Sequence, residues 1–464
     1  MEEHMVTKLK QTANSFPHFL LLFIVFQPIL DLLTSFSIYV LHMSATVGIV
    51  VRFAFMLLAL GYLLLHYKQQ GAKKYILYLC LFGIVLAIGL VNNLMVKSPV
   101  SFGEEVKFIL KSIYPIVLLF GYIIALKELK NNEYVFHKMI TYFLYATLIL
   151  SISLITAMVT GTDFQSYPHS KIGSRGWFFA GNDLSAIFAI MFPIVVLYSI
   201  HKTTSFSKFY YWIPTVLAMY ASLMVGTKVG YGAIIVTLGV ALLFSFIQYM
   251  MHRKKEGKGF TYLVNTVVAA VVLGGLLVLT PQTPIAKNMS IHLQIYEYKK
   301  SVQEEKDRKE GKEVQEEEQH KQGELTDSEM KSLIYSDRDK FLKVYKQYYK
   351  EAPLSQKLFG MGYAGNYTTK MKLVEMDFHD LFFAFGIVGF LMYLLPLLYF
   401  GIKIFIRLIT NFKKLFSVKH MLLASTLVLS LGIAFMSGHV LTAPAVSIFF
   451  VVILAYLIVD LEIE

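Results

Sequence analysis

The fold of this chain is decided by the stretch MDFHDLFFAFGIVGFLMYLLPLLYFGI, which covers residues 376–402. It opens with a short ionisable cluster around His379 and continues over residues 382–402 without a charged side chain. A helix needs roughly 20 apolar residues to cross the hydrocarbon layer of a membrane. The stretch therefore predicts a membrane-spanning helix that carries ionisable groups at one membrane face.

Apolar blocks of this kind recur along the whole chain. Twelve qualify as spans, at residues 17–40, 46–66, 75–95, 106–126, 138–160, 178–200, 209–226, 229–249, 261–280, 382–402, 421–438 and 441–459. Only helices or closed barrels satisfy the backbone in lipid, and these blocks are too long and too uniformly apolar for barrel strands. We therefore expect an all-α polytopic membrane protein with about 12 transmembrane helices.

The composition agrees with this class. Of the 464 residues, 56% are hydrophobic and 16% are charged, and the mean hydropathy is +0.57. The formal net charge of +12 does not indicate a nucleic-acid partner, because the basic residues lie mainly in short loops, where they anchor the topology. The single Cys80 lies within an apolar block and offers neither a disulfide nor a cysteine metal site. The first block is too long for a cleaved signal peptide, so we expect it to be retained.

Basic residues precede the first block and follow every second one. They are Lys8, Lys10, Lys68, Lys73, Lys74, Lys127, Lys130, His201, Lys202, Lys208, Arg253, Lys254, Lys255, Lys258, Lys403, Arg407, Lys413, Lys414 and Lys419. The positive-inside rule places these loops and both termini in the cytoplasm. The outward connections are then 41–45, 96–105, 161–177, 227–228, 281–381 and 439–440.

One outward connection is far larger than the others and divides the chain into three parts. Transmembrane helices 1–9 occupy residues 1–280, the large extracytoplasmic loop occupies 281–381, and helices 10–12 occupy 382–464. Within the loop, the stretch 299–332 is dense in Lys and Glu and is interpreted as a solvated surface element. In 336–351, Phe341, Val344, Tyr345 and Tyr348 repeat with helical spacing on one apolar face. Arg338 would then lie in the first turn of a helix packed over the membrane.

Six cations are predicted at the outer ends of the helices or in the outer loops. They are Arg52, Lys107, Lys111, Arg175, Lys228 and Arg338. Each one alone is explained equally well by snorkelling to lipid headgroups. Together, with few acids in the outer helix ends, they favour an anion site. A pyrophosphate fits such a site, since Arg offers paired donors and Lys a point charge.

His379 is a candidate general base at the same face. An unperturbed imidazole has a pKa of roughly 6.5 and accepts protons near neutral pH, and Asp377 or Asp380 could orient it. A structural histidine is the alternative. No spacing of His, Asp and Glu indicates a metal site. Asp31, within the first span, is either a helix-packing or a proton-relay residue.

Three pieces of the chain, in this order, resemble the O-antigen ligase and polymerase superfamily of bacterial envelope glycosyltransferases. RGWFFAGNDLSA (175–186) resembles the family's polar start of a span. The segment from Ser336-Asp337-Arg338 to Gly360-Met361-Gly362 resembles its loop Arg, helix and G-x-G turn. FHDL (378–381) followed by FGIVG (385–389) resembles its His-bearing motif with a G-hydrophobic-hydrophobic-G end.

Two positions depart from the family pattern. Lys228, in TKVG (227–230), stands where an Arg is usual, which keeps the charge but loses bidentate geometry. Asp380 follows His379 where Asn is usual.

The resemblance implies a GT-C-like fold and metal-independent, inverting transfer of a sugar chain from an undecaprenyl-pyrophosphate donor to an acceptor hydroxyl, without a cofactor. His379 and Arg338 would be catalytic. The substrate and its pyrophosphate would be bound by Lys228, Arg175, Lys111, Lys107, Arg52 and Asp380. The partners implied are the lipid-linked donor glycan, an acceptor glycan or lipid-linked glycan, membrane lipids and polysaccharide-assembly proteins. The site would face outward from the bacterial cytoplasmic (inner) membrane.

Several functions stay open within and beyond this resemblance. The Lys-, Ile- and Tyr-rich composition is typical of an AT-rich genome, such as that of a Gram-positive bacterium, where no lipid A acceptor exists. This favours a cell-surface polysaccharide polymerase. A ligase that transfers the finished polysaccharide to a terminal acceptor is the alternative. A lipid-linked-sugar flippase or transporter is the alternative of another class, for which ionisable residues near mid-membrane are expected. A scaffold subunit would need none of the outer cations.

Overall fold

The structure is a computed structural model that describes residues 2–43, 46–129, 131–167, 171–254, 257–309, 336, 338–368 and 370–463. Every regular element in these ranges is a helix. The first half contains α1 (Glu2–Tyr39), α2 (Val47–Leu65), α3 (Ala72–Val96), α4 (Phe102–Glu128), α5 (Asn132–Val159), α6 (Gly181–Lys202), the 3₁₀ helix η1 (Phe206–Trp212), α7 (Ile213–Val225) and α8 (Lys228–His252).

The second half continues the helical pattern through the large loop to the end of the chain. It contains α9 (Lys258–Leu279), η2 (Thr280–Gln282), α10 (Pro284–Lys309), α12 (Arg338–Glu351), α13 (Leu354–Phe359), α14 (Asp377–Thr410), α15 (Phe412–Leu415), α16 (Val418–Met436) and α17 (Pro444–Asp460). The charged stretch 299–332 lies partly in α10, and its part after Lys309 lies outside the described residues.

Ten helices in the described ranges are long and apolar enough to span a membrane, namely α1–α6, α8, α9, α14 and α16. The all-helical polytopic class is confirmed, but the prediction of about 12 such helices was too high. Block 209–226 divides into η1 and the 13-residue α7. Block 441–459 forms the 17-residue α17, because its first residues belong to a turn whose backbone amides bind Asp377.

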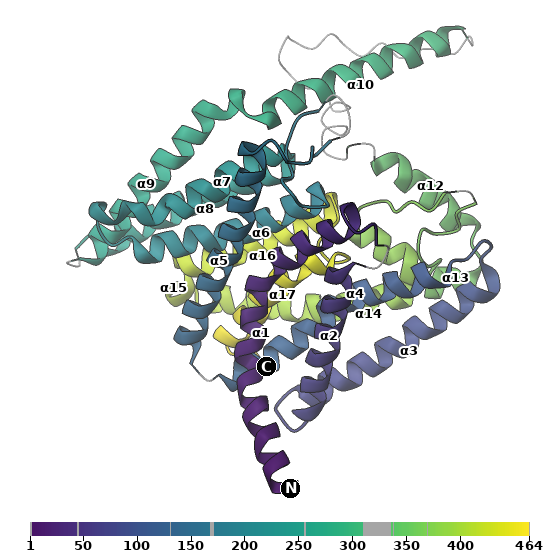
Figure 1. Cartoon of the computed structure of the whole chain (residues 1–464), viewed down its shortest axis with the longest axis horizontal. Helices are drawn as coiled ribbons and strands as arrows, with labels where there is room; N and C mark the ends of the chain where they lie inside the picture. Colours follow the sequence, from purple (N-terminus) through teal and green to yellow (C-terminus); the bar gives the residue numbers. More distant parts are fainter. Residues whose placement is uncertain are drawn as a thin grey trace.

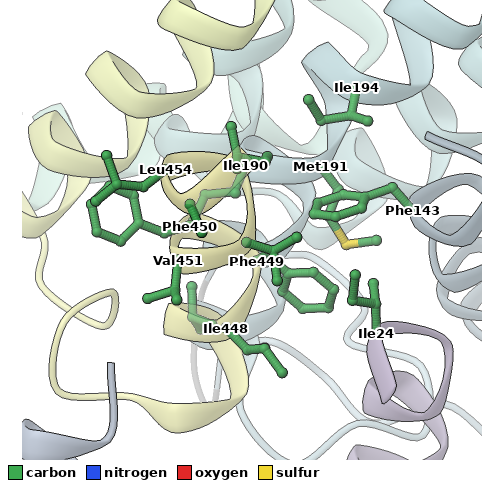
Figure 2. Packing of buried hydrophobic residues seen from close by; sticks show 14 of the residues in the cluster. Ile24, Phe143, Ile190, Met191, Ile194, Ile448, Phe449, Phe450, Val451 and Leu454 are labelled. Atoms are coloured by element: carbon green, nitrogen blue, oxygen red, sulfur yellow. The ribbon is translucent and has the colours of Figure 1, made fainter. Parts of the chain in front are cut away.

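The core of the bundle is built around α17. This helix packs against α4, α6, α16 and α1, and Figure 1 shows it in yellow among them. Its residues from Val446 to Ile458 are all buried, as expected of a helix that is apolar on every side. Figure 2 shows Phe449 of α17 beside Phe143 of α5, with the two ring centroids 5.7 Å apart. A rigid centre of this kind fixes the helix ends around it.

The helix α14 is broken near its start by Gly386, which has φ of 66° and ψ of −172°. The turn at Gly360 docks against this break, with Met361 N donating to Phe383 O at 2.8 Å. A Cβ on Gly386 would lie 2.4 Å from Gly360 N, and one on Gly360 would lie 2.0 Å from Ala384 O. The glycines of two family-like motifs therefore pack backbone against backbone, which anchors the large loop to α14.

Candidate active site

Two cavities lie at one end of the bundle, among helix ends that the charge pattern predicts to face outward. The cationic cavity has a volume of about 230 Å³. Its polar and charged lining consists of Tyr167, Lys171, Asn182, Ser185, Thr227, Lys228, Ser336, Arg338, Glu375, Ser437 and His439. The wide cavity has a volume of about 400 Å³. It is mostly apolar, and its ionisable lining residues are Asp31, Arg52, Lys111, Asp183, Glu375, Asp377, Asp380 and His439.

Lys228 reaches the cationic cavity because a sharp turn starts α8 there. Gly226 ends α7 with φ of 78°, and a Cβ at this position would lie 2.7 Å from Ile172 O. The Thr227 hydroxyl then caps α8 by accepting from Gly230 N at 3.2 Å. Lys228 is the first residue of α8, and its Nζ donates to Ser336 Oγ at 3.4 Å.

Arg338 enters the same cavity from α12, where it is the first residue. Its side chain is only 14% exposed, and its Nη2 lies 3.7 Å from Glu375 Oε2. The Arg338 Nε is buried and has no hydrogen-bond partner among the described residues. Two largely buried cations beside one carboxylate leave positive charge in a confined space, which favours a bound anion.

Glu375 and His439 line both cavities, and we call this pair the junction. Both have positive φ, 64° and 65°, a conformation that costs non-glycine residues of order 1 kcal/mol or more and persists where the surroundings enforce it. Gly438 lets the two loops approach, because a Cβ there would lie 2.8 Å from Glu375 O. The junction is therefore a place where backbone strain and ionisable groups coincide.

Asp377 and Asp380 hold the backbone of the junction. The buried Asp377 carboxylate accepts from the amides of His439, Val440 and Leu441 at 3.1, 2.7 and 2.7 Å. The Asp380 carboxylate accepts from Val374 N at 2.8 Å and from Met376 N at 3.1 Å. These two acids therefore fix loops around the junction, whereas the sequence had them orienting His379.

The His439 imidazole is oriented by a carboxylate from α6. Its Nδ1 lies 3.0 Å from Asp183 Oδ1, and its buried Nε2 has no hydrogen-bond partner in the described part of the chain. Burial alone would lower the pKa of His439, but the hydrogen bond to Asp183 and the negative charges of Asp183, Asp377 and Glu375 raise it to about 9. The ring is therefore cationic at neutral pH.

The other predicted cations divide between the wide cavity and the periphery. Arg52 and Lys111 line the wide cavity, and Arg52 Nη2 donates to Asp31 Oδ1 at 2.7 Å. This ion pair joins α1 to α2, as expected if Asp31 has a helix-packing role. Lys107 and Arg175 lie outside both linings. Lys107 pairs with Glu104 at 3.3 Å, and the Arg175 guanidinium donates to Tyr39 OH at 2.9 Å.

The family model described as O-antigen ligase like membrane protein matches residues 13–464. This chain belongs to that family. Comparison with curated proteins and with solved structures found no match. Membership implies that this O-antigen ligase-like protein has a role in glycan transfer during cell envelope biosynthesis.

His379, the predicted base of this O-antigen ligase-like protein, lies beside the cavities rather than in their linings. It is half-buried near the start of α14, and its ring centroid is 6.0 Å from that of Phe435. Its Nδ1 is buried without a hydrogen-bond partner among the described residues. Its catalytic role stays a prediction.

Sequence reasoning missed the junction and Asp183. Asp183 lies within the segment RGWFFAGNDLSA (175–186), but no role was predicted for it. Glu375 directly precedes the stretch 376–402. His439 occupies a two-residue break between apolar blocks, where a polar residue after Gly438 was a usable signal. The described residues contain no group of three or more His, Cys, Asp and Glu side chains arranged for a metal ion. Metal independence itself remains a prediction.

Proposed function

We propose that this protein is a glycosyltransferase that moves a sugar chain from an undecaprenyl-pyrophosphate donor to an acceptor hydroxyl at the outer membrane face. The observation that carries the proposal is the cationic cavity, where Lys228 and Arg338 meet beside the junction. This cavity shares Glu375 and His439 with the wide cavity. Two binding spaces with common ionisable residues suit a reaction between two bound substrates.

The chemistry of the leaving group explains why cations are required. When the anomeric carbon leaves the pyrophosphate, negative charge develops on the departing oxygen. Arg338 offers paired donors to phosphate oxygens and Lys228 a compact positive charge. Both side chains are held in place before the reaction, so they stabilise the charge without reorganisation. The same argument supports a metal-independent reaction, and a single displacement without a protein nucleophile would invert the anomeric centre.

A polymerase is favoured over a ligase by Lys111 in the lining of the wide cavity. Arg52 in the same lining is paired with Asp31, so Lys111 adds a second positive charge to this space. A polymerase joins two lipid-linked glycans, each with a pyrophosphate, whereas a ligase transfers to a terminal acceptor that need not carry one. We therefore propose a cell-surface polysaccharide polymerase in the bacterial cytoplasmic membrane, with both termini cytoplasmic.

A flippase or transporter is less well supported. Asp31 was the main acidic group expected within the membrane, and Arg52 neutralises it in an ion pair of 2.7 Å. The remaining ionisable groups of the two cavities lie near helix ends that the charge pattern predicts to face outward, where transfer at the membrane surface needs them. Carriers place such groups near mid-membrane instead.

The test is product formation by purified protein in liposomes that contain a synthetic lipid-linked repeat unit. We expect mass analysis to show chain formation, with and without a chelator. Arg338→Ala and Lys228→Met should each lower the rate by about 10²-fold or more, as expected for loss of a charge that stabilises the leaving group. Lys202→Met, an exposed change at the end of α6, is the matched control. Movement of substrate across the membrane without bond formation would contradict the proposal and favour a carrier.

A further inference from the structure

We infer that the junction itself performs the transfer: Glu375 takes the proton from the acceptor hydroxyl, and His439 donates a hydrogen bond to the leaving pyrophosphate. This inference rests on the proposed function and deepens it. It assigns the acid–base work to residues from two separate loops rather than to His379, the histidine that the sequence singled out.

The geometry of His439 leaves only one ring nitrogen for a substrate. Nδ1 is engaged with Asp183 at 3.0 Å, and Nε2 is buried without a partner in the described part of the chain. A histidine whose far nitrogen is fixed by a carboxylate has its ring orientation and protonation set by that carboxylate. The other nitrogen, Nε2, can then form a hydrogen bond with a substrate bound in the cavities that His439 lines.

The protonation of His439 follows from the groups that face it. Those that line the two cavities are Asp183 from α6, Glu375, Asp377 and Asp380 at the start of α14, Asp31 from α1, Arg52 from α2, Lys111 from α4, Lys228 from α8, Lys171 from the loop before α6, and Arg338 from α12. The acids nearest to the ring raise its pKa to about 9. At neutral pH Nε2 therefore carries a proton, and it is a donor rather than a base.

Glu375 is the carboxylate available for the base role. Asp377 and Asp380 are committed to backbone amides, and Asp183 to His439. Glu375 faces both cavities and, among the described residues, forms ion pairs with Arg338 and Lys372. Its strained backbone, with φ of 64°, lies close to Gly438, the residue before His439, since a Cβ on Gly438 would lie 2.8 Å from Glu375 O. Protonation of Glu375 would also release Arg338 from its 3.7 Å ion pair, which makes the guanidinium free to bind the pyrophosphate.

The step balances as a single displacement. The acceptor oxygen attacks the anomeric carbon and forms the new glycosidic bond, while its proton passes to the Glu375 carboxylate. The bond from the anomeric carbon to the pyrophosphate oxygen breaks, and its electron pair stays on that oxygen. The lipid pyrophosphate leaves with one more negative charge, held by His439, Arg338 and Lys228. Glu375 then returns its proton to water.

The experiment compares histidine and carboxylate variants in the liposome transfer assay. Glu375→Gln and His439→Gln should each lower kcat by about 10²- to 10⁴-fold, the usual contribution of a positioned acid or base. His379→Gln should cost at least tenfold less than His439→Gln, and His137→Gln, on α5, is the control. Glu375→Asp and thermal unfolding of every variant separate chemistry from misfolding. A His379→Gln loss as large as that of His439→Gln would overturn the inference.

Asp183→Asn gives a readout that a purely structural role would not move. It keeps a hydrogen-bond acceptor for Nδ1 but removes the charge that favours the imidazolium. Wild-type activity should fall as the pH rises through about 9, and the variant's alkaline limb should lie at least one unit lower. An unchanged limb would contradict the assignment. If the wild type forms no glycan product, the proposed function fails; if it does and these variants behave like controls, only this inference fails.

Discussion

At the scale of single residues, Asp377 is the side chain on which the geometry of the junction depends. It is 1% exposed and accepts from three successive backbone amides and from the Thr442 hydroxyl at 2.6 Å. The turn after α16 would otherwise leave these buried donors unsatisfied, at a cost of roughly 1–3 kcal/mol each. One carboxylate thereby positions His439 and forces α17 to begin only at Pro444.

Replacing Asp377 by Asn should destabilise the protein by about 2–3 kcal/mol, because an amide group would turn donors toward backbone donors. It should also lower transfer activity, since His439 would lose its position. The measurement is thermal unfolding of the purified protein in detergent, together with the liposome assay. Asp339→Asn, on the exposed first turn of α12, is the matched control. Equal stability of the two variants would show that the turn does not depend on Asp377.

At the scale of elements, the large loop docks onto the bundle at the break in α14. The chain leaves α13 through Gly360, crosses the backbone of α14 at Gly386, and returns to the junction through residues 370–376. Gly362 N donates to Ala384 O at 3.1 Å, so the turn completes hydrogen bonds that the broken helix leaves open. The loop that carries Arg338 is therefore fixed at its far end, although the chain between α10 and α12 is long.

Gly386→Ala should destabilise the protein by about 3 kcal/mol or more, because it adds steric overlap to an unfavourable positive φ. The added Cβ would lie 2.4 Å from Gly360 N and 2.5 Å from Leu358 O. Gly401→Ala, in the same helix but with nothing within 4 Å, should be neutral or stabilising by up to about 1 kcal/mol. Unfolding midpoints in detergent decide the matter, and similar midpoints for both variants would show that the break is not packed as described.

At the scale of the whole molecule, ionisable side chains separate into two populations. Most of the basic residues used to assign the topology lie near helix ends or in loops on the predicted cytoplasmic side. The ionisable residues of the cavities gather at the opposite helix ends, buried or half-buried beside the predicted outer loops. A charge in the hydrocarbon layer is expensive, and positions at helix ends avoid that cost. Under the proposed function, they would also let a lipid-linked substrate stay in the bilayer while its pyrophosphate reaches the cations.

This arrangement predicts the sidedness of labelling in intact cells. In a Cys80→Ser background, Lys343→Cys on α12 should react with a membrane-impermeant thiol reagent, because the predicted topology places α12 outside. Lys202→Cys at the end of α6 should react only after the cells are broken, although it too is exposed in the structure. The reverse pattern would place both cavities in the cytoplasm and remove the basis for an outer-face reaction.

Much of the site could be reached from local patterns, and the rest could not. Arg338 and Lys228 were predicted together and do line one cavity, because both begin helices at ends that charge rules place outward. His379 was favoured because it opens a long apolar segment at the end of the large loop. The direction in which it points, beside Phe435, depends on how α14 packs against α16, and no local spacing reveals that packing.

The amino-acid pattern was enough to predict an all-helical membrane protein of the O-antigen ligase-like family, with cations at one face. Hydrocarbon thickness and the cost of buried charge act on each segment separately, so local sequence reflects them directly. Which polar groups meet depends instead on how the helices pack. Asp183, Glu375 and His439 come from three distant parts of the chain. They line one cavity because α6, α14, α16 and α17 pack against one another.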